Sequence, residues 1–299
     1  MNTQPLKILI FGAGKSGPGW LAGHYLSYFN AKPDKYLAEI STADITQKEQ
    51  VTAALEQARP GIVINAAGKT HSAKCANIDG CEESEEAKQQ TLDINAKGPK
   101  VIAECCAKKG IRMVHLSSGC IFDGYKEGGF TENDTPNPVS WYTQTKVMAD
   151  ENLRQFPNVL ILRIRMPISD EPVGRNFIYK VAHYKKVINV INSVTVVDSL
   201  MQATEELIAK NQQGIFNVVN PVPVNHFKIM EWYDQIVDPS HKGTYEKISL
   251  EELSKITLTG RSNCTISTKK LNDVGVYLPD APQAIQACLR RYVQVLKAG

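Results

Sequence analysis

Long hydrophobic runs are missing from this sequence of 299 residues. No stretch approaches the roughly 18 to 20 apolar residues that a membrane-spanning helix needs. The first seven residues also lack the charged and apolar regions of a secretory signal. We therefore expect a cytoplasmic protein that has no membrane partner.

Blocks of positive charge are missing as well. The 34 Lys and Arg residues nearly balance the 31 Asp and Glu residues, which leaves a net charge of +3, and no Lys/Arg block is longer than two residues. A protein that binds a phosphate backbone needs a concentrated basic surface. We therefore expect no nucleic-acid partner.

Regular cysteine spacing is the third absence. The seven cysteines form no CxxC pair, so reduced thiols are expected rather than a disulfide framework. His71, Cys75 and Cys81 lack a fourth ligand at a usual spacing, and no metal site is predicted.

The sequence does contain an alternation of short apolar runs and helical patterns. Residues 6–11 and 61–65 are typical of strands buried on both faces, and helical spacing follows over 20–29 and 46–58. The other predicted elements are a weak strand at 36–40, a long helix at 86–109, a strand at 112–116, a helix at 142–154, a strand at 159–164, a helix at 198–210 and a strand at 215–219. This alternation predicts an α/β fold with a doubly wound parallel sheet of the Rossmann type.

The predicted domains follow from where this alternation weakens. Residues 1–165 are expected to form a dinucleotide-binding Rossmann domain, to which residues 187–219 return. Residues 166–186 and 220–299 combine short helices with Pro and Asn turns, and we expect them to form a smaller α+β substrate-binding cap.

Gly12-Ala13-Gly14-Lys15-Ser16-Gly17 matches G-x-G-x-x-G between a predicted strand and a predicted helix, where backbone N–H groups can hold a pyrophosphate. A P-loop is excluded because it needs glycine at the position of Leu9. Glu39 and Asp44 are the candidate carboxylates for a ribose hydroxyl, although Ser41-Thr42 could equally face a 2′-phosphate. These residues leave the choice between NADP(H) and NAD(H) open.

Tyr142-Thr143-Gln144-Thr145-Lys146 has the Y-x-x-x-K spacing, which puts a phenol and an ammonium on one face of a helix. A phenol with a pKa near 10 needs such an ammonium to exchange a proton at neutral pH. Upstream, Ser118 ends a predicted strand and can donate to a carbonyl oxygen on which charge develops. The order strand, serine, tyrosine, lysine resembles that of a short-chain dehydrogenase/reductase.

A narrower resemblance begins at Asn65-Ala66-Ala67-Gly68. The motifs that carry it are Ser118-Gly119-Cys120-Ile121-Phe122, Phe130-Thr131-Glu132, Leu162-Arg163-Ile164-Arg165-Met166-Pro167-Ile168, Arg175-Asn176-Phe177, Asn192-Ser193-Val194-Thr195, residues 217–221 and Arg261-Ser262-Asn263. In these motifs the chain resembles the plant and giant-virus bifunctional UDP-4-keto-6-deoxyglucose 3,5-epimerase/4-reductases, which make UDP-L-rhamnose. It is more distantly similar to dTDP-4-dehydrorhamnose reductase. The resemblance implies an extended short-chain dehydrogenase/reductase.

The resemblance also implies a role for each matched position. Ser118, Tyr142 and Lys146 match the reductase triad, and Cys120 and Lys180 match the base and acid of epimerisation. Simple reductases lack this cysteine, so Cys120 is the residue that argues for two activities. The predicted cofactor-binding residues are Gly12, Gly14, Lys15, Ser16, Gly17, Asp44, Ile45, Ala66, Ala67, Gly68, Asn95, Tyr142, Lys146, Met166 and Pro167. The predicted substrate-binding residues are Thr70, Cys120, Trp141, Arg175, Asn176, Lys180, Asn192, Arg261 and Asn263.

The sequence departs from this family in two places that concern the cofactor. Its glycine loop is two residues longer than the family's Gly-Lys-Thr-Gly-Trp, and the arginine expected after the second strand is missing. NADP(H) is expected ahead of NAD(H), and Asp44-Ile45 resembles the Asp-Phe that contacts adenine in dTDP-4-dehydrorhamnose reductase.

Several alternatives stay open. The substrate could be linked to dTDP or another nucleotide, and the chain could be a 4-keto reductase without epimerase activity. It could also be a non-catalytic binding subunit like the reductase-like regulatory subunit of methionine adenosyltransferase. The sequence leaves open whether the chain forms a homodimer.

Overall fold

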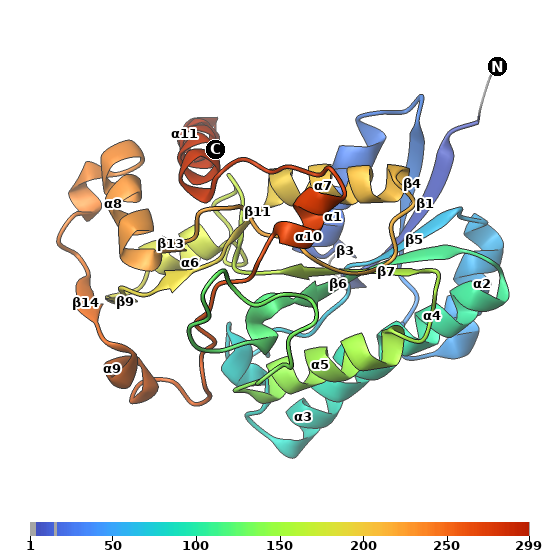
Figure 1. Ribbon diagram of the computed structural model, residues 1–299, viewed down its shortest axis with the longest axis horizontal. Helices are drawn as coiled ribbons and strands as arrows, with labels where there is room; N and C mark the ends of the chain where they lie inside the picture. The colour runs from blue at the N-terminus through green and yellow to red at the C-terminus, as the bar shows by residue number, and fades with distance from the viewer. Residues whose placement is uncertain (1–3, 15–16, 299) are drawn as a thin grey trace. The chain divides into compact units, whose positions relative to one another are not determined.

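The computed structural model describes residues 4–14 and 17–298 (Figure 1). The chain divides into two compact units. The first contains Met1–Ser118, Trp141–Leu162 and Lys210–Phe216, and the second contains Gly119–Ser140, Arg163–Ala209 and Asn217–Gly299. Four stretches that we expected in the first domain group with the second unit: residues 119–140, 163–165, 187–209 and 217–219. That one unit binds a dinucleotide and the other the substrate stays a prediction.

A six-stranded sheet is the framework of the first unit. Strand β1 (Leu6–Phe11) pairs in parallel with β4 (Tyr36–Ser41) on one side and with β5 (Ile62–Asn65) on the other. Strand β6 (Arg112–Ser118) continues in parallel from β5, and β7 (Val159–Ile164) and β12 (Gly214–Asn217) complete the order β12-β7-β6-β5-β1-β4. The strand order reverses between β1 and β5, which confirms the predicted doubly wound sheet.

The helices of the first unit lie between these strands along the chain. The helical elements are α1 (Trp20–Asn30), α2 (Lys48–Ala58), the 3₁₀ turn η1 (Ile78–Cys81), α3 (Glu85–Leu92), the π-helix η2 (Asp93–Lys97), α4 (Gly98–Lys108) and α5 (Trp141–Leu153). The Ser84 hydroxyl caps α3 by accepting from the Ala87 N–H. The negative charges of Glu85 and Glu86 in the first turn interact favourably with the positive end of the helix dipole. The long helix predicted at 86–109 is therefore confirmed, with a π turn in its middle.

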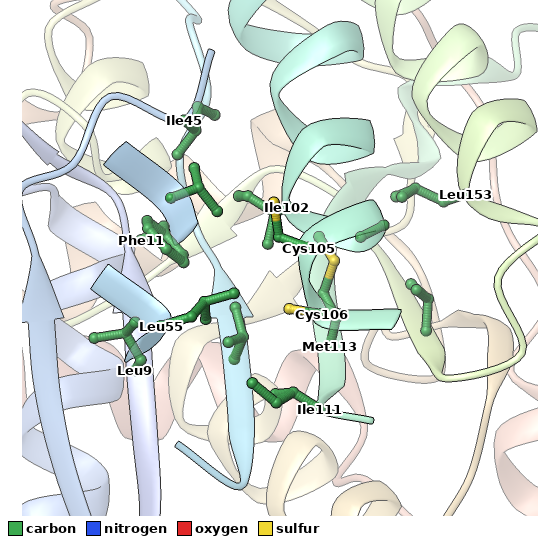
Figure 2. Packing of buried hydrophobic residues seen from close by; sticks show 14 of the residues in the cluster. Leu9, Phe11, Ile45, Leu55, Ile102, Cys105, Cys106, Ile111, Met113 and Leu153 are labelled. Carbon is green, nitrogen blue, oxygen red and sulfur yellow. The ribbon is translucent and has the colours of Figure 1, made fainter. Parts of the chain in front are cut away.

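The core of the first unit explains why β1 is apolar from Ile8 to Phe11 (Figure 2). Leu9 and Phe11 pack with α2 and α4 residues such as Leu55 and Ile102 in one cluster. Ile8 and Ile10 are buried as well. Side chains alternate between the two faces of a strand, so β1 is covered on both faces.

The second unit is built from short elements around its own core. Its strand pairs are β8 (Pro167–Ile168) with β11 (Thr195–Val196), β9 (Lys186–Ile188) with β14 (Glu246–Ile248), and β10 (Ile191–Asn192) with β13 (Val224–Asn225). Its helical elements are η3 (Gly119–Ile121), α6 (Phe177–Ala182), α7 (Val197–Ala209), α8 (His226–Ile236), η4 (Pro239–His241), α9 (Leu250–Ser254), α10 (Lys269–Asp273) and α11 (Ala281–Ala298). Buried residues of α6, α8 and α11 share one cluster. Among the described helices, none is long and apolar enough to cross a membrane.

Candidate functional site

The turn after β1 brings Gly12 and Gly19 into close backbone contact. A Cβ atom on Gly19 would lie 2.7 Å from the carbonyl oxygen of Gly12, which also accepts the Gly19 N–H at 2.7 Å. A Cβ atom on Gly12, where φ is +139°, would lie 3.0 Å from the Ala66 carbonyl carbon and 3.2 Å from Ala22 Cβ. These two positions therefore need glycine, and Ala22 takes the helix-packing position of the third fingerprint residue.

Two glycines of the predicted motif make no such approach. A Cβ atom on Gly14 or on Gly17 would meet no atom of the described residues within 4 Å. The reason is the longer loop, in which β2 (Ala13–Gly14) pairs with β3 (Gly17–Pro18) before the helix begins. The fingerprint geometry is thus shifted to Gly19, which the sequence motif missed. Lys15 and Ser16, both predicted to bind the cofactor, lie outside the described residues.

Helix α1 begins directly after this turn. Gly19 is its N-cap, and no side chain of the described residues caps the first-turn N–H groups. An uncapped helix start that glycines leave accessible suits an anionic group. The turn therefore fits the pyrophosphate of a dinucleotide.

Helix α5 carries Tyr142 and Lys146 one turn apart on the same face. Lys146 is only 4% exposed, and its Nζ donates to the Leu116 carbonyl oxygen of β6 at 3.2 Å. Burial lowers the pKa of Lys146 to about 8, although the negative charge of Asp150 acts in the opposite direction. An ammonium with this pKa is suited to sharing protons with a phenol near neutral pH.

Ser118 is the last residue of β6 and is buried. The preceding residue, Ser117, donates from its hydroxyl to Asp150 Oδ1 at 2.5 Å. Asp150 is itself 2% exposed and follows Lys146 by one turn of α5. The first unit therefore holds all three predicted triad residues on β6 and α5, which pack against each other.

Asn95 lies in the π-helix η2 and holds a loop of the predicted site. Its Oδ1 accepts the Lys69 N–H at 2.7 Å, and its Nδ2 donates to the Lys69 carbonyl at 2.9 Å. A Cβ atom on Gly68 would lie 3.6 Å from Asn95 Oδ1 and 3.7 Å from Lys146 Nζ. Asn95, Gly68 and Lys146 are thus neighbours, while Thr70 follows on the same loop and is half-buried.

Other predicted cofactor residues of the first unit have structural partners. Asp44 Oδ1 accepts from both the N–H and the hydroxyl of Thr46. Ile45 is 6% exposed and belongs to the hydrophobic core. Ala66 donates its N–H to the Phe11 carbonyl, and Ala67 donates to Asn65 Oδ1. Their contacts with a cofactor stay a prediction.

Trp141 is anchored within the first unit. Its backbone N–H donates to Glu82 Oε1 at 3.1 Å, and its indole Nε1 donates to the Lys88 carbonyl at 2.9 Å. This polar anchoring accounts for the tryptophan at the start of α5. Whether its ring also contacts substrate stays a prediction.

The second unit holds the predicted epimerisation pair. Cys120 lies half-buried in η3, directly after Gly119. Lys180 lies in α6, where burial lowers its pKa and the positive charge of Arg175 lowers it further. Arg175 is exposed by surface area, but partial desolvation lowers its pKa as well. A lysine that gives up its proton more readily is suited to acid catalysis.

Asn176 has a structural role at the start of α6. It is fully buried, its Oδ1 caps the helix by accepting the Ile178 N–H, and its Nδ2 donates to the carbonyls of Ser169 and Glu171. Asn176 therefore fixes the loop that precedes Lys180.

Met166 has a left-handed backbone with φ of +42° before Pro167, an uncommon conformation for a side chain of this size. Its sulfur lies 3.2 Å from His226 Nε2. Burial, together with the nearby positive charge of Arg165, lowers the pKa of His226 to about 3, so the imidazole is neutral. This contact supports the strained Met166-Pro167 turn.

Asn192, Arg261 and Asn263 come together in the second unit. Asn192 Nδ2 donates to Asn263 Oδ1 at 3.0 Å, and Asn263 Nδ2 donates to the Arg261 carbonyl at 2.9 Å. Arg261 also donates from Nη1 to the Thr259 carbonyl. The structure thus groups Asn192 with two predicted substrate residues, Arg261 and Asn263, that are distant from it in the sequence.

The chain is similar to known proteins over most of its length. The family described as RmlD substrate binding domain matches residues 6–291. A bifunctional dTDP-4-dehydrorhamnose 3,5-epimerase/dTDP-4-dehydrorhamnose reductase of Arabidopsis thaliana is 35% identical over 90% of this chain and 88% of its own length. Trifunctional Arabidopsis proteins, with dehydratase, epimerase and reductase activities in their names, are also 35% identical. The chain spans about two fifths of their length; for one of these proteins the share is 40%.

Solved structures are similar over nearly the whole chain. The L780 UDP-rhamnose synthase of Acanthamoeba polyphaga mimivirus superposes with a TM-score of 0.88 at 29% identity, covering 96% of this chain and 99% of that one. A dTDP-4-dehydrorhamnose reductase from Bacillus anthracis, solved in complex with NADP, has a TM-score of 0.79 at 19% identity over 96% of this chain and 99% of its own. The match over residues 6–291 and the identity to full-length relatives establish that the chain belongs to the RmlD substrate binding domain family.

Proposed function

We propose that this protein is an NAD(P)H-dependent epimerase/reductase that converts UDP-4-keto-6-deoxy-D-glucose to UDP-L-rhamnose by 3,5-epimerisation and 4-keto reduction. The observation that carries the proposal is the buried Lys146, whose lowered pKa and place one turn after Tyr142 suit proton transfer beside Ser118. The names of the Arabidopsis and mimivirus relatives support the same pair of reactions.

The first unit fits a dinucleotide cofactor. Gly12 and Gly19 form a cradle that a Cβ atom would fill, and α1 begins there without a cap from any side chain that the structure describes. The uncapped first turn of α1 would hold the pyrophosphate, and Lys146 would hold the nicotinamide ribose. When bound, the cofactor supplies the hydride that reduces C4. We expect NADPH ahead of NADH.

Reduction needs a proton for the C4 oxygen as well as a hydride. Tyr142 donates its phenolic proton to that oxygen, and the Lys146 ammonium stabilises the phenolate that remains. Ser118 donates a hydrogen bond to the same oxygen while negative charge develops on it. The hydroxyl groups of Ser118 and Tyr142 therefore stabilise the C4 oxygen both during ketone reduction and in the enolate of the epimerisation step.

Epimerisation exchanges the hydrogens on C3 and C5, which flank the C4 ketone. Cys120, as the thiolate, removes the proton from carbon, and the electron pair of the broken C–H bond forms the enolate. Lys180 delivers a proton to the opposite face of that carbon, which inverts it. The thiol then loses its proton to solvent and the lysine regains one, so each cycle introduces solvent hydrogen.

A single incubation tests the proposal. The protein, UDP-4-keto-6-deoxyglucose and NADPH or NADH are combined in deuterium oxide, and both nucleotide oxidation and label at C3 and C5 are followed. Oxidation with label at both carbons is the expected result. Oxidation without label would leave a plain 4-reductase, and no reaction would contradict the proposal for this nucleotide sugar. The dTDP-linked analogue, tested in parallel, decides between the two nucleotides.

Two cysteine variants assign the epimerisation step. Cys120→Ala should lose label incorporation while it still reduces UDP-4-keto-L-rhamnose. Cys75→Ala is the matched control, since Cys75 is likewise half-buried but lies in a loop of the first unit. Unchanged incorporation in Cys120→Ala would exclude the thiol as the base.

A further inference from the structure

Arg165 is a fully buried arginine at the end of β7, and three segments of the second unit bind its guanidinium. Nη1 donates to the Gly119 carbonyl at 3.1 Å and to Ser262 Oγ at 2.8 Å. Nη2 donates to Asn192 Oδ1 at 2.7 Å and to the Ser262 carbonyl at 3.3 Å. One planar group therefore fixes three stretches of chain that are far apart in sequence.

The partners of Arg165 are all neutral oxygens. No carboxylate pairs with it in the described part of the chain, and its Nε has no hydrogen-bond partner there. Burying a charge without an opposite charge is costly, and an apolar side chain of similar volume often stabilises a protein more. Stability alone therefore does not account for an arginine at this position.

The first segment that Arg165 fixes carries the predicted base. Gly119 separates Ser118 from Cys120 along the chain. A Cβ atom on Gly119 would lie 2.9 Å from Arg165 Cγ and 2.7 Å from Ile266 Cδ1, so the glycine packs directly on the arginine stem. The hydrogen bond to the Gly119 carbonyl and this packing together determine the backbone position of Gly119, and thereby that of the adjoining Cys120.

The second and third segments carry predicted substrate residues. Ser262 stands between Arg261 and Asn263, and its hydroxyl also donates to the Phe122 carbonyl. Asn192 Oδ1 accepts both from Arg165 and from the Cys264 N–H, which leaves Asn192 Nδ2 to hold Asn263. The same guanidinium thus orients the residues expected at the diphosphate and the loop of the thiol.

We propose that Arg165 is a positioning residue that holds the Cys120 loop and the Arg261-Ser262-Asn263 segment in a fixed relation. A nucleotide sugar that is bound by Arg261 and Asn263 is then presented to the Cys120 thiol. This inference rests on the proposed function. It adds a residue that touches neither substrate nor cofactor but determines both affinity for the nucleotide diphosphate and the rate of proton exchange.

Arg165→Lys tests the proposal because lysine keeps the charge but cannot reach three segments with a planar fork. Arg163→Lys is the matched control. Arg163 is equally buried two residues earlier, where it donates to the Glu132 carbonyl and stacks over the Phe122 ring. Thermal unfolding of both variants measures how much stability each loses.

The expected result is a split between kinetic constants. Misplacing a site by about 1 Å can cost about 100-fold, so Arg165→Lys should raise KM for the UDP-sugar and the Kd for UDP by about ten-fold or more, and slow label incorporation at C3 and C5 similarly. The kcat for reducing saturating UDP-4-keto-L-rhamnose should change by no more than about three-fold, because Ser118, Tyr142 and Lys146 belong to the first unit. Arg163→Lys should keep KM, Kd and incorporation near the wild-type values.

The proposal would be overturned if Arg165→Lys and Arg163→Lys had the same KM, Kd and kcat and the same rate of label incorporation. If Arg165→Lys does not fold, Ser262→Ala removes the Arg165 contact at 2.8 Å, together with the hydrogen bond to the Phe122 carbonyl, but keeps the other three contacts of the guanidinium. It should shift KM and incorporation in the same direction by a smaller factor. If the wild-type protein neither binds UDP nor turns over the sugar, the proposed function fails. The inference is then judged by the rate of Cys120 alkylation, which should differ between Arg165→Lys and Arg163→Lys and, if equal, refutes it.

Discussion

Ser117 donates a hydrogen bond of 2.5 Å to Asp150, and both side chains are almost completely buried. The contact joins the end of β6 to the middle of α5, one residue before Ser118 and one turn after Lys146. Asp150 also raises the pKa of Lys146 against the larger effect of burial. A residue outside the predicted triad therefore influences the protonation of one of its members.

Removing the charge of Asp150 should change the pH dependence of the reaction. In Asp150→Asn the side chain can still accept from Ser117, but the negative charge that favours the Lys146 ammonium is lost. The alkaline limb of kcat/KM, expected near the Lys146 pKa of about 8, should move to lower pH by about one unit. Glu151→Gln alters the exposed neighbouring carboxylate and should leave the limb in place. An unshifted limb in Asp150→Asn would show that Lys146 does not respond to this carboxylate.

Replacing Lys146 should abolish activity and stabilise the fold at pH 7. The unfolded chain has a lysine pKa near 10.4, whereas burial lowers the folded value to about 8. The unfolded state thus binds more protons between these values, so wild-type stability rises with pH from about 8 to 10.4. Lys146→Met should lack this rise and gain about 2 kcal/mol at pH 7, after allowing for the lost bond to Leu116. Urea unfolding from pH 7 to 10 measures both effects, and a destabilised variant at pH 7 would contradict this account.

The glycine turn predicts opposite outcomes for two alanine variants. Gly19→Ala places a methyl group 2.7 Å from the Gly12 carbonyl, so the turn must shift. We expect a loss of about 1 to 3 kcal/mol in the free energy of unfolding and NADPH binding weaker by at least about ten-fold. The methyl group of Gly14→Ala meets no atom of the described residues within 4 Å. The free energy of unfolding of this variant should therefore lie within about 0.5 kcal/mol of the wild-type value. Cofactor fluorescence titration and chemical unfolding test both, and equal stability of the two variants would argue against the shifted fingerprint.

Buried histidines should make the protein sensitive to acid. His226 has a pKa lowered to about 3 by burial and by Arg165, and the pKa of buried His115 is also well below its usual value. The unfolded chain binds these protons near pH 6.5, so stability falls as pH drops from 6.5 toward 3, by up to about 1.4 kcal/mol per pH unit for each histidine. His226→Phe should remove one of the two contributions, as unfolding at pH 7, 6 and 5 would reveal. His183→Gln, at an exposed site, serves as the control and should keep the full wild-type slope.

Much of the fold could be predicted because burial leaves a direct pattern in sequence. Residues 6–11 and 159–164 are apolar on both faces except at Lys7 and Arg163, and they are central strands, as expected. Strand β4 is weak as a pattern because Leu37 and Glu39 are exposed, and only its pairing with β1 makes it regular. The grouping of 187–209 with the second unit depends on tertiary packing that periodicity does not record.

The site was predictable in its residue types and less so in its geometry. Y-x-x-x-K identified α5, and the same helical spacing, extended by one turn, contains Asp150. The motif G-x-G-x-x-G led to Gly12, Gly14 and Gly17, of which only Gly12 makes a close approach, and the other close approach falls at Gly19. A motif counts positions along the chain, but the requirement for glycine depends on which backbone lies opposite, here Gly12 and Ala66.

The π-helix at Asp93–Lys97 makes this part of the chain sensitive to its length. An α-helix turns about 100° per residue, and a π turn accommodates one residue more than an α turn. Deleting a single residue there would let α3 and α4 merge into one regular helix and would rotate Asn95 away from the Lys69 backbone that it holds at both ends. A one-residue deletion in this helix would therefore be more disruptive than most substitutions. It would change the direction in which Asn95 points without changing any side chain.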